Sequence, residues 1–396
     1  MKFKGLKVGL LSVALVLVGT AAPAAGKTLT IWVGTGEVAT YEAASAAWAK
    51  ANNVNLKIVA KCGLGDCGMA QIAPTGAGPD LVSVGHDSTG GLVKSGLVES
   101  ISGNVNKALF STSVLEGVSY KYQIYGVPLS ISNVALATNL ALVPDGAPKT
   151  WKELESTAVS LIESKKANVG IVTHLDGYFG YPFFAAIGGY VFDTKSNAYI
   201  NSKNNGLYSS KLAKNAYLMD KWLDEKLFDA TNTYDASEFM NGKAPFSLVG
   251  PWAMAGLAKS GIKYDLSGIP SVSGGIAPSF SGVTALYLNR FSKNKLLARD
   301  FLVKVAQTTA FQTALSNFNV NYPALKSAAA LVDPKSDAGK IGAYGQLCTP
   351  MPNIAEMGTV WSYWNGAFAD WASGKTKFGP AMKEASANLK KALASS

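Results

Sequence analysis

The chain has 396 residues, of which 48% are hydrophobic and 16% are charged, and its net charge is +10. This length exceeds one typical domain core, so two domains are expected. The basic residues are scattered and are not interleaved with aromatic residues, which argues against nucleic-acid binding despite the positive charge.

The first segment has the pattern of a secretory signal peptide. Three lysines in the first seven residues precede an apolar run over 8–18, and Ala22-Pro23-Ala24 supplies small residues at the spacing of a signal-peptidase site. The apolar run is shorter than the ~20 residues of a membrane span. We therefore expect residues 1–24 to be removed near Ala24, with an uncleaved anchor as the alternative. No cysteine lies near this site, so a periplasmic protein without a lipid anchor is expected, with its net charge lowered from +10 to +7.

Strands and helices alternate along the rest of the chain. Apolar and β-branched runs predict strands at 28–33, 54–60 and 80–85. A long extended stretch follows at 126–142. Helical spacing predicts helices at 40–53, 150–166, 215–228, 293–307 and 378–395, and a short helix with a loop at 91–101. This order indicates an α/β architecture with a largely parallel sheet. The helix at 150–166 opens with Thr150 and Glu153, which form the signature of a capping box.

The three cysteines divide into a pair and a single residue. Cys62 and Cys67 flank a glycine-containing turn, and in an oxidising compartment this spacing predicts a small disulfide loop. Four intervening residues exclude a redox motif of the Cys-x-x-Cys type. Cys348 is then left as a buried free thiol. Because the chain has only two histidines, a histidine-based zinc site is not expected, and we predict neither metal nor cofactor.

Aromatic residues gather in segments bounded by glycine and proline. Asp176 and Tyr178 lie on either side of a glycine in 174–184, Trp252 follows Gly-Pro, and Trp361 lies in the aromatic stretch 357–374. Aromatic rings lie flat against the apolar faces of sugars, and carboxylates accept hydrogen bonds from sugar hydroxyls. The pattern therefore predicts a carbohydrate cleft. The alternative for each tryptophan is core packing. We favour core packing for Trp364 and Trp371, which share helical spacing with Phe368.

Four motifs carry a resemblance to a known family: TGAGPDLVSVGHDSTGGLVKSGLV (75–98), HLDGYFGYPFFAAIGGYVF (174–192), FSLVGPWAM (246–254) and MPNIAEMGTVWSYW (351–364). In this order and at these distances they resemble the maltose/maltodextrin-binding proteins of bacterial ABC importers, over nearly the whole mature chain. The resemblance implies a type II periplasmic binding-protein fold, with two α/β lobes joined by crossing strands and a ligand cleft between them. The implied lobes are discontinuous, an N-terminal lobe at 25–131 and 284–335 and a C-terminal lobe at 132–283 and 336–396.

The resemblance also assigns ligand-binding residues. It implies sugar-hydroxyl contacts at Asp87 and Asp176, stacking at Tyr178, Trp252 and Trp361, and a structural role for His86 beside Asp87. Glu37 is the charged residue of the loop after the first strand and completes the predicted set. The chain departs from the family pattern at Val84, Ser88, Ser132 and Met254, where the best-studied maltodextrin binders have tryptophan, a basic residue, glutamate and tryptophan. These differences leave open whether the ligand is maltose, a maltodextrin or a related sugar.

These residues predict a substrate-binding protein that delivers an oligosaccharide to the membrane permease subunits of an ABC importer, acts as a monomer and is not an enzyme. One alternative is a secreted carbohydrate-active hydrolase, which needs two carboxylates about 5–10 Å apart. A second is a binder of a non-sugar solute. An amino-acid binder would need an arginine for the ligand carboxylate. The only arginines, Arg290 and Arg299, lie in or beside a helix-like stretch away from the aromatic loops. The glycine-rich stretch lacks the Gly-Lys-Ser/Thr ending of a phosphate loop.

Overall fold

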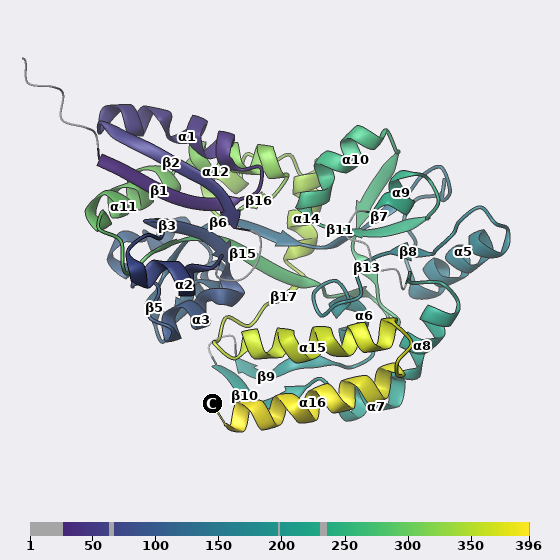
Figure 1. Ribbon diagram of the computed structural model, residues 1–396. Coiled ribbons are helices and arrows are strands. Elements are labelled where there is room, and N and C mark those ends of the chain that lie inside the picture. The colour runs from purple at the N-terminus through teal and green to yellow at the C-terminus, as the bar shows by residue number, and fades with distance from the viewer. Residues whose placement is uncertain (1–26, 63–66, 197–198, 230–235, 396) are drawn as a thin grey trace, which may run out of the picture.

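A computed structural model describes residues 27–62, 67–196, 199–229 and 236–395. Figure 1 shows two groups of elements, each with its own sheet and covering helices. The first sheet has the strand order β16-β6-β15-β3-β1-β2, with β17 added beside β15. Its strands are β1 (Lys27–Gly34), β2 (Val54–Cys62), β3 (Leu81–Gly85), β6 (Gly126–Asn133), β15 (Phe280–Leu288), β16 (Tyr322–Pro323) and β17 (Thr349–Pro350). The helices of this group include α1 (Val38–Ala51), α3 (Thr89–Lys94), α4 (Thr112–Gly117), α11 (Lys295–Phe301), α12 (Thr309–Asn319) and α13 (Lys326–Ala329).

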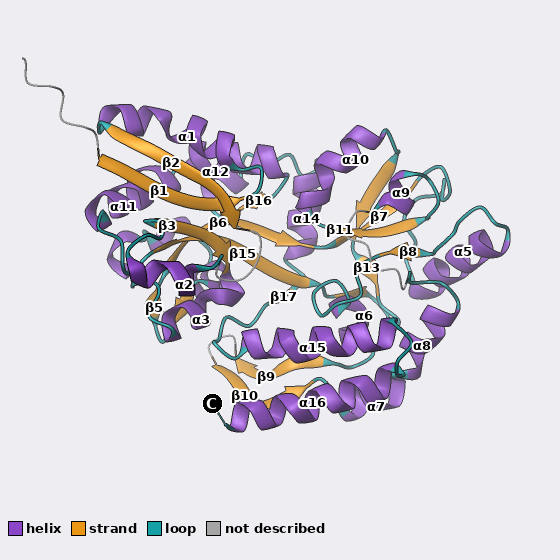
Figure 2. Ribbon diagram, in the orientation of Figure 1, coloured by secondary structure: helices purple, strands orange, loops and turns teal. Residues whose placement is uncertain are grey.

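The second group surrounds a smaller sheet of order β12-β7-β11-β8. Its strands are β7 (Ala135–Asn139), β8 (Ile171–Val172), β11 (Phe246–Val249) and β12 (Tyr264–Ser267). Its helices include α5 (Trp151–Glu163), α6 (Tyr181–Ala186), α8 (Tyr217–Asp224), α10 (Met254–Ser260), α14 (Asp337–Gly345), α15 (Met357–Ala372) and α16 (Phe378–Ala394). The helices α15 and α16 run side by side next to the hairpin of β9 (Tyr190–Ser196) and β10 (Tyr199–Gly206) (Figure 2).

Three separate hydrophobic cores define the two lobes. One core takes its buried residues from 29–129 and 283–328, and we call the elements around it the N-terminal lobe. A second core takes them from 134–280 and 357–389, and a third takes them from 135–266 and 341–344. We call the elements around these two cores the C-terminal lobe. The chain passes between the lobes where β6 runs directly into β7, and again along β15, whose first residue Phe280 lies in the C-terminal core. The exact lobe boundaries given above stay a prediction.

The larger sheet is mixed, which corrects the expectation of a largely parallel sheet. β1 pairs in parallel with β2 and β3, as the alternation of strands and helices predicts. β15 pairs antiparallel with both β3 and β6. β6 leaves this lobe for the other one and β15 returns from it, so the two strands run in opposite directions and do not need the helical crossover that links parallel neighbours.

Most predicted helices are present, and their ends follow local chemistry. The capping box that starts α5 is confirmed: the Thr150 hydroxyl accepts from the Glu153 N–H at 3.2 Å, and the Glu153 carboxylate accepts from the Thr150 N–H at 3.2 Å. The short helix with a loop predicted at 91–101 is confirmed: α3 ends at Lys94 and the chain turns at Gly96 with a φ of +65°. The predicted helix at 293–307 changes from α11 into a π-helix over Leu302–Ala306.

The structure tests some of the expectations for the tryptophans, the cysteines and the signal peptide. Trp364 and Trp371 are 0% and 1% exposed in the C-terminal core, so their prediction as core residues is confirmed. Cys348 is a free thiol, half-buried rather than fully buried. Residues 1–24, the Cys62 side chain and the loop 63–66 lie outside the described residues, so the signal peptide and the Cys62–Cys67 disulfide stay predictions. Within the described ranges, no helix is long and apolar enough to cross a bilayer, and no group of three metal-ligating side chains occurs.

Candidate ligand-binding site

The structure brings Asp87 and Trp361 into direct contact. Asp87 lies in a 3₁₀ turn, His86–Ser88, immediately after the carboxyl end of β3, which is where open α/β sheets place ligand contacts. Trp361 lies in the second turn of α15. Its indole N–H donates to Asp87 Oδ2 at 3.1 Å, across 274 positions of sequence. Two predicted site residues from opposite lobes therefore form one unit.

An aromatic wall continues from Trp361 along the C-terminal lobe. The ring centroids of Trp361 and Phe280 are 6.0 Å apart, those of Phe280 and Tyr178 are 6.3 Å apart, and those of Tyr178 and Trp252 are 6.1 Å apart. Tyr178 and Trp361 are half-buried, whereas Trp252 is 51% exposed, so core packing does not explain Trp252. The three predicted stacking residues are thus linked by ring contacts, through Phe280, which is itself buried at 1% exposure. Sequence reasoning missed Phe280, the ring that connects Tyr178 to Trp361.

Glycines allow this wall to form. A Cβ on Gly250 would lie 2.4 Å from the ring of Trp252, because that ring folds back over its own loop. A Cβ on Gly177 would lie 2.5 Å from the ring of Trp364. Gly177 therefore lets the loop that carries Tyr178 approach α15 closely. The glycine-bounded context of these aromatics, visible in the sequence, has a direct steric cause.

Two of the three predicted carboxylates accept hydrogen bonds from backbone N–H groups. Asp176 Oδ1 accepts from the N–H groups of Tyr178 at 2.9 Å and Phe179 at 2.8 Å, and so fixes the loop that presents Tyr178. Glu37 Oε2 accepts from the Gly34 N–H at 2.9 Å, at the end of β1. Asp87 differs from both, because among the described residues only the Trp361 indole donates to it, which leaves Oδ1 available.

His86 is a buried structural residue beside Asp87. It is 1% exposed, its Nδ1 accepts from the Val283 N–H at 2.9 Å, and its Nε2 lies 3.0 Å from the Met351 carbonyl oxygen. Since Nδ1 accepts, Nε2 carries the proton and donates to Met351, which defines a neutral imidazole. Burial lowers the pKa of His86 below its ordinary value, in agreement with this state.

The departures from the family pattern are explained differently at different positions. Val84 and Met254 are 6% and 2% exposed and belong to the hydrophobic cores of their lobes. Ser132 lies on the connecting strand β6, half-buried, and its hydroxyl would lie 3.4 Å from a Cβ placed on Gly282 of β15. Among the described side chains, the aromatic rings of the wall and the carboxylate of Asp87 are therefore the groups best placed to contact a ligand.

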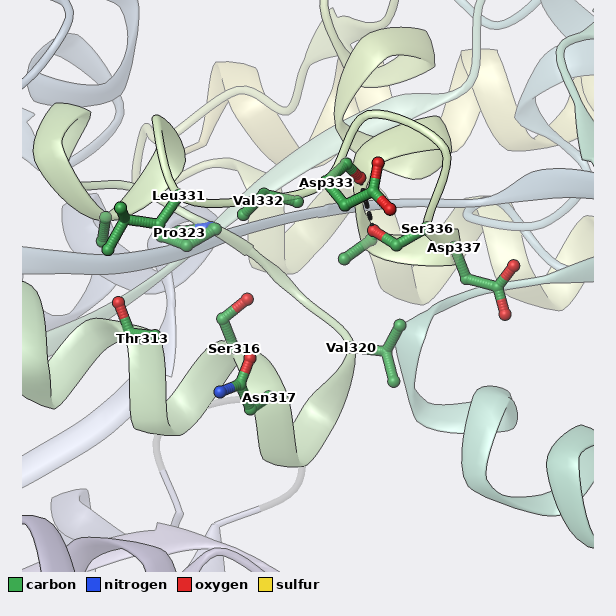
Figure 3. Close-up of a pocket in the computed structure, with 12 residues that line it drawn as sticks. Thr313, Ser316, Asn317, Val320, Pro323, Leu331, Val332, Asp333, Ser336 and Asp337 are labelled. Carbon is green, nitrogen blue, oxygen red and sulfur yellow. Dashed lines mark hydrogen bonds between the residues drawn. The ribbon is translucent and has the colours of Figure 1, made fainter.

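Two cavities lie at different places. A small hollow beside Trp252 is lined by Thr173, His174, Phe179 and Ser247. A larger cavity of about 360 Å³ lies between α12, the segment after α13, and the start of α14 (Figure 3). Its lining includes Asn317, Val320 and Asp337 but none of the six predicted ligand-binding residues. The larger cavity is therefore separate from the candidate site.

Comparison with known proteins gives the family of the chain. The model of the bacterial extracellular solute-binding protein family matches residues 38–341. A galactooligosaccharide-binding protein of Bacillus subtilis is 27% identical over 92% of this chain and 89% of its own length, and a maltodextrin-binding protein, MdxE, of the same organism is 28% identical over 82% and 80%. A maltooligosaccharide ABC transporter solute-binding lipoprotein of Streptococcus pneumoniae is 25% identical over 93% and 89%. The chain belongs to the bacterial extracellular solute-binding protein family.

Proposed function

We propose that this protein binds a neutral oligosaccharide between its two lobes and delivers it to the permease of an ABC importer. The observation that carries the proposal is the Asp87–Trp361 unit, which sets a carboxylate beside an aromatic wall that includes Tyr178 and Trp252. The similar proteins named above are described as binding galactooligosaccharides, maltodextrins and maltooligosaccharides, which supports a sugar ligand. Because those names differ, the proposal specifies an oligosaccharide and no single sugar.

The chemistry of the six residues favours an uncharged sugar. Flat rings cover the apolar face of a pyranose, and the free Asp87 oxygen accepts from a hydroxyl group. None of the six predicted residues is cationic, so the set offers no partner for a uronate or a phosphate. We propose that the remaining predicted residues, Asp176 and Glu37, act at the cleft chiefly by holding the loops around it.

Export belongs to the same proposal. We propose that the leader is removed near Ala24 and that the mature protein is periplasmic, monomeric and without a lipid anchor, since the first cysteine of the chain is Cys62. One similar protein is a lipoprotein, so this point needs a direct test. Mass spectrometry of the exported protein is expected to give a start just after Ala24 and no added lipid mass. Retention of Met1 would contradict the proposed cleavage.

A thermal-shift screen with a panel of neutral oligosaccharides, uronates and amino acids tests the ligand class. A ligand that binds only the native state stabilises it by mass action, by about 2.7 kcal/mol at 100 times Kd. We expect shifts with one or more neutral oligosaccharides and none with the charged solutes. Chromatography of the best sugar after prolonged incubation is expected to return it intact. A shift only with charged solutes, or the appearance of shorter sugars, would contradict the proposal.

A further inference from the structure

The segment from Met351 to Trp361 joins the two lobes on the side of the candidate site. It begins after β17 and includes the first turns of α15. Its apolar side chains belong to the C-terminal lobe: Met357 is fully buried in that core, and Met351 and Ile354 pack against it. Several of its polar groups, in contrast, bond to the N-terminal lobe: those of Asn353, the Met351 carbonyl and the Trp361 indole N–H. This division makes the segment a direct link between the two lobes.

Asn353 makes the largest set of these bonds. The nitrogen of its side-chain N–H₂ group lies 2.8 Å from the carbonyl oxygens of Glu116 and Gly117 and 2.7 Å from that of Ser119, so its two hydrogens serve three acceptors and one hydrogen is shared. The first two belong to the last turn of α4, where the Glu116 carbonyl also accepts from the Val118 N–H and the Gly117 carbonyl also accepts from the Thr89 hydroxyl at 3.5 Å. One side chain of the linking segment thus bonds to the C-terminal end of a helix in the other lobe.

Two further contacts secure the same segment. The Gly90 N–H of α3 donates to the Asn353 carbonyl oxygen at 2.9 Å, and a Cβ on Gly90 would lie 2.4 Å from the Ala355 nitrogen. The backbones are therefore in direct contact, and only glycine fits there. Two residues before Asn353, the Met351 carbonyl accepts from His86, the neighbour of Asp87. The segment that precedes Trp361 is therefore hydrogen-bonded both to α3 and to His86, the neighbour of Asp87.

We infer that Asn353 is a positioning residue of the ligand-binding site. By tying the start of α15 to the end of α4, it fixes the Trp361 indole N–H on Asp87 Oδ2, so that Oδ1 is the oxygen left to accept from a ligand. The inference rests on the proposed function only where it takes the ligand that bonds to Oδ1 to be a sugar. The placement of the indole N–H is a property of the unliganded protein and can be measured without any sugar.

The first measurement is hydrogen exchange of the Trp361 indole N–H in the ligand-free mature protein, followed by ¹⁵N NMR and assigned with Trp361→Phe. In Asn353→Ala we expect exchange about tenfold faster, as for the loss of a local restraint. Gln307→Ala is the matched control. Its amide also donates to two backbone carbonyls of the N-terminal lobe, those of Asn104 at 2.7 Å and Leu302 at 2.9 Å, and it is 8% exposed. It is expected to lower stability but to leave the Trp361 exchange unchanged.

The second measurement is calorimetric titration with the best sugar from the screen. We expect Asn353→Ala to weaken affinity about tenfold in the wild-type background and less than about twofold in the Trp361→Phe background, because the two residues act through one contact. Gln307→Ala is expected to change affinity less than about twofold. Asn353→Ser, which retains one donor, is the milder variant should the alanine protein fail to fold, and it is expected to lie between wild type and alanine.

Each outcome decides a separate point. Wild-type indole exchange in a folded Asn353 variant overturns the positioning role, whatever the sugar data show. Equal loss of affinity in both backgrounds also overturns it, because the effect then bypasses Trp361. If no sugar binds the wild-type protein, the proposed function fails, while the exchange data still decide whether Asn353 positions the indole.

Discussion

Replacing Trp252 with alanine removes the most exposed of the proposed stacking rings. The side chain is 51% exposed, and a tryptophan presents up to ~250 Å² of surface, so about 125 Å² is open to a ligand. At ~25 cal/mol per Å² of apolar area, covering this surface contributes about 3 kcal/mol to binding. We therefore expect affinity for the best sugar to fall by roughly 2–4 kcal/mol, which is roughly 30-fold to 1,000-fold.

The same substitution has a smaller effect on folding. The buried part of the ring packs against Tyr178 and Phe179, with ring centroids at 6.1 Å and 5.9 Å, and such pairs contribute about 0.5–1.5 kcal/mol each. We expect a lowered but cooperative melting transition of the ligand-free variant. Calorimetric titration measures the loss of affinity, and a melting curve measures the loss of stability.

The control is Tyr217→Ala, which removes another exposed aromatic ring from the C-terminal lobe. Tyr217 is 63% exposed at the start of α8 and belongs to none of the aromatic contacts of the wall. It is expected to change neither affinity nor the sugar-induced shift in melting temperature. Wild-type affinity in Trp252→Ala, or equal losses in the two variants, would refute the stacking argument.

Three further predictions use other parts of the site and fold. Trp361→Ala is expected to lower affinity by roughly 2–4 kcal/mol and Asp87→Asn by roughly 1–2 kcal/mol, measured by the same titration; normal affinity with a collapsed melting temperature would mark both as purely structural. Burial lowers the folded-state pKa of His86, so the unfolded chain binds the proton more readily and stability is lost as pH falls from about 6.5 through the folded pKa. Melting curves from pH 7 to pH 5 are expected to show this loss of stability, and His86→Gln is expected to reduce it. An identical pH dependence in the variant would exclude His86 as the source of the loss. The unfolded, unreduced mature protein is expected to titrate as one free thiol, with a Cys62–Cys67 disulfide contributing at most about 2–3 kcal/mol; three free thiols would show that the pair is reduced.

Short-range features of the sequence predicted much of this architecture. Apolar alternation and helical spacing located β1, α1, β2 and β3, because side-chain direction repeats every two residues in a strand and every 3.6 in a helix. The capping box located the start of α5, because both of its hydrogen bonds join residues three positions apart. Helical spacing also separated the core residues Trp364 and Trp371 from Trp252, whose Gly-Pro context marks a loop.

The tertiary structure decided which of the candidate residues meet and what their polar groups do. The antiparallel placement of β15 depends on how the chain returns from the second lobe, and no local period carries that information. The carboxylates of Asp87 and Asp176 look alike in the sequence, yet one bonds to an indole 274 positions away and the other to the backbone of its own loop. Asn353 has no special local pattern, because its three acceptors lie more than 230 residues earlier in the chain. Hydrogen bonds between distant segments form only where folding brings a donor to an acceptor, so the sequence supplies the groups and the packing of the two lobes selects the pairs.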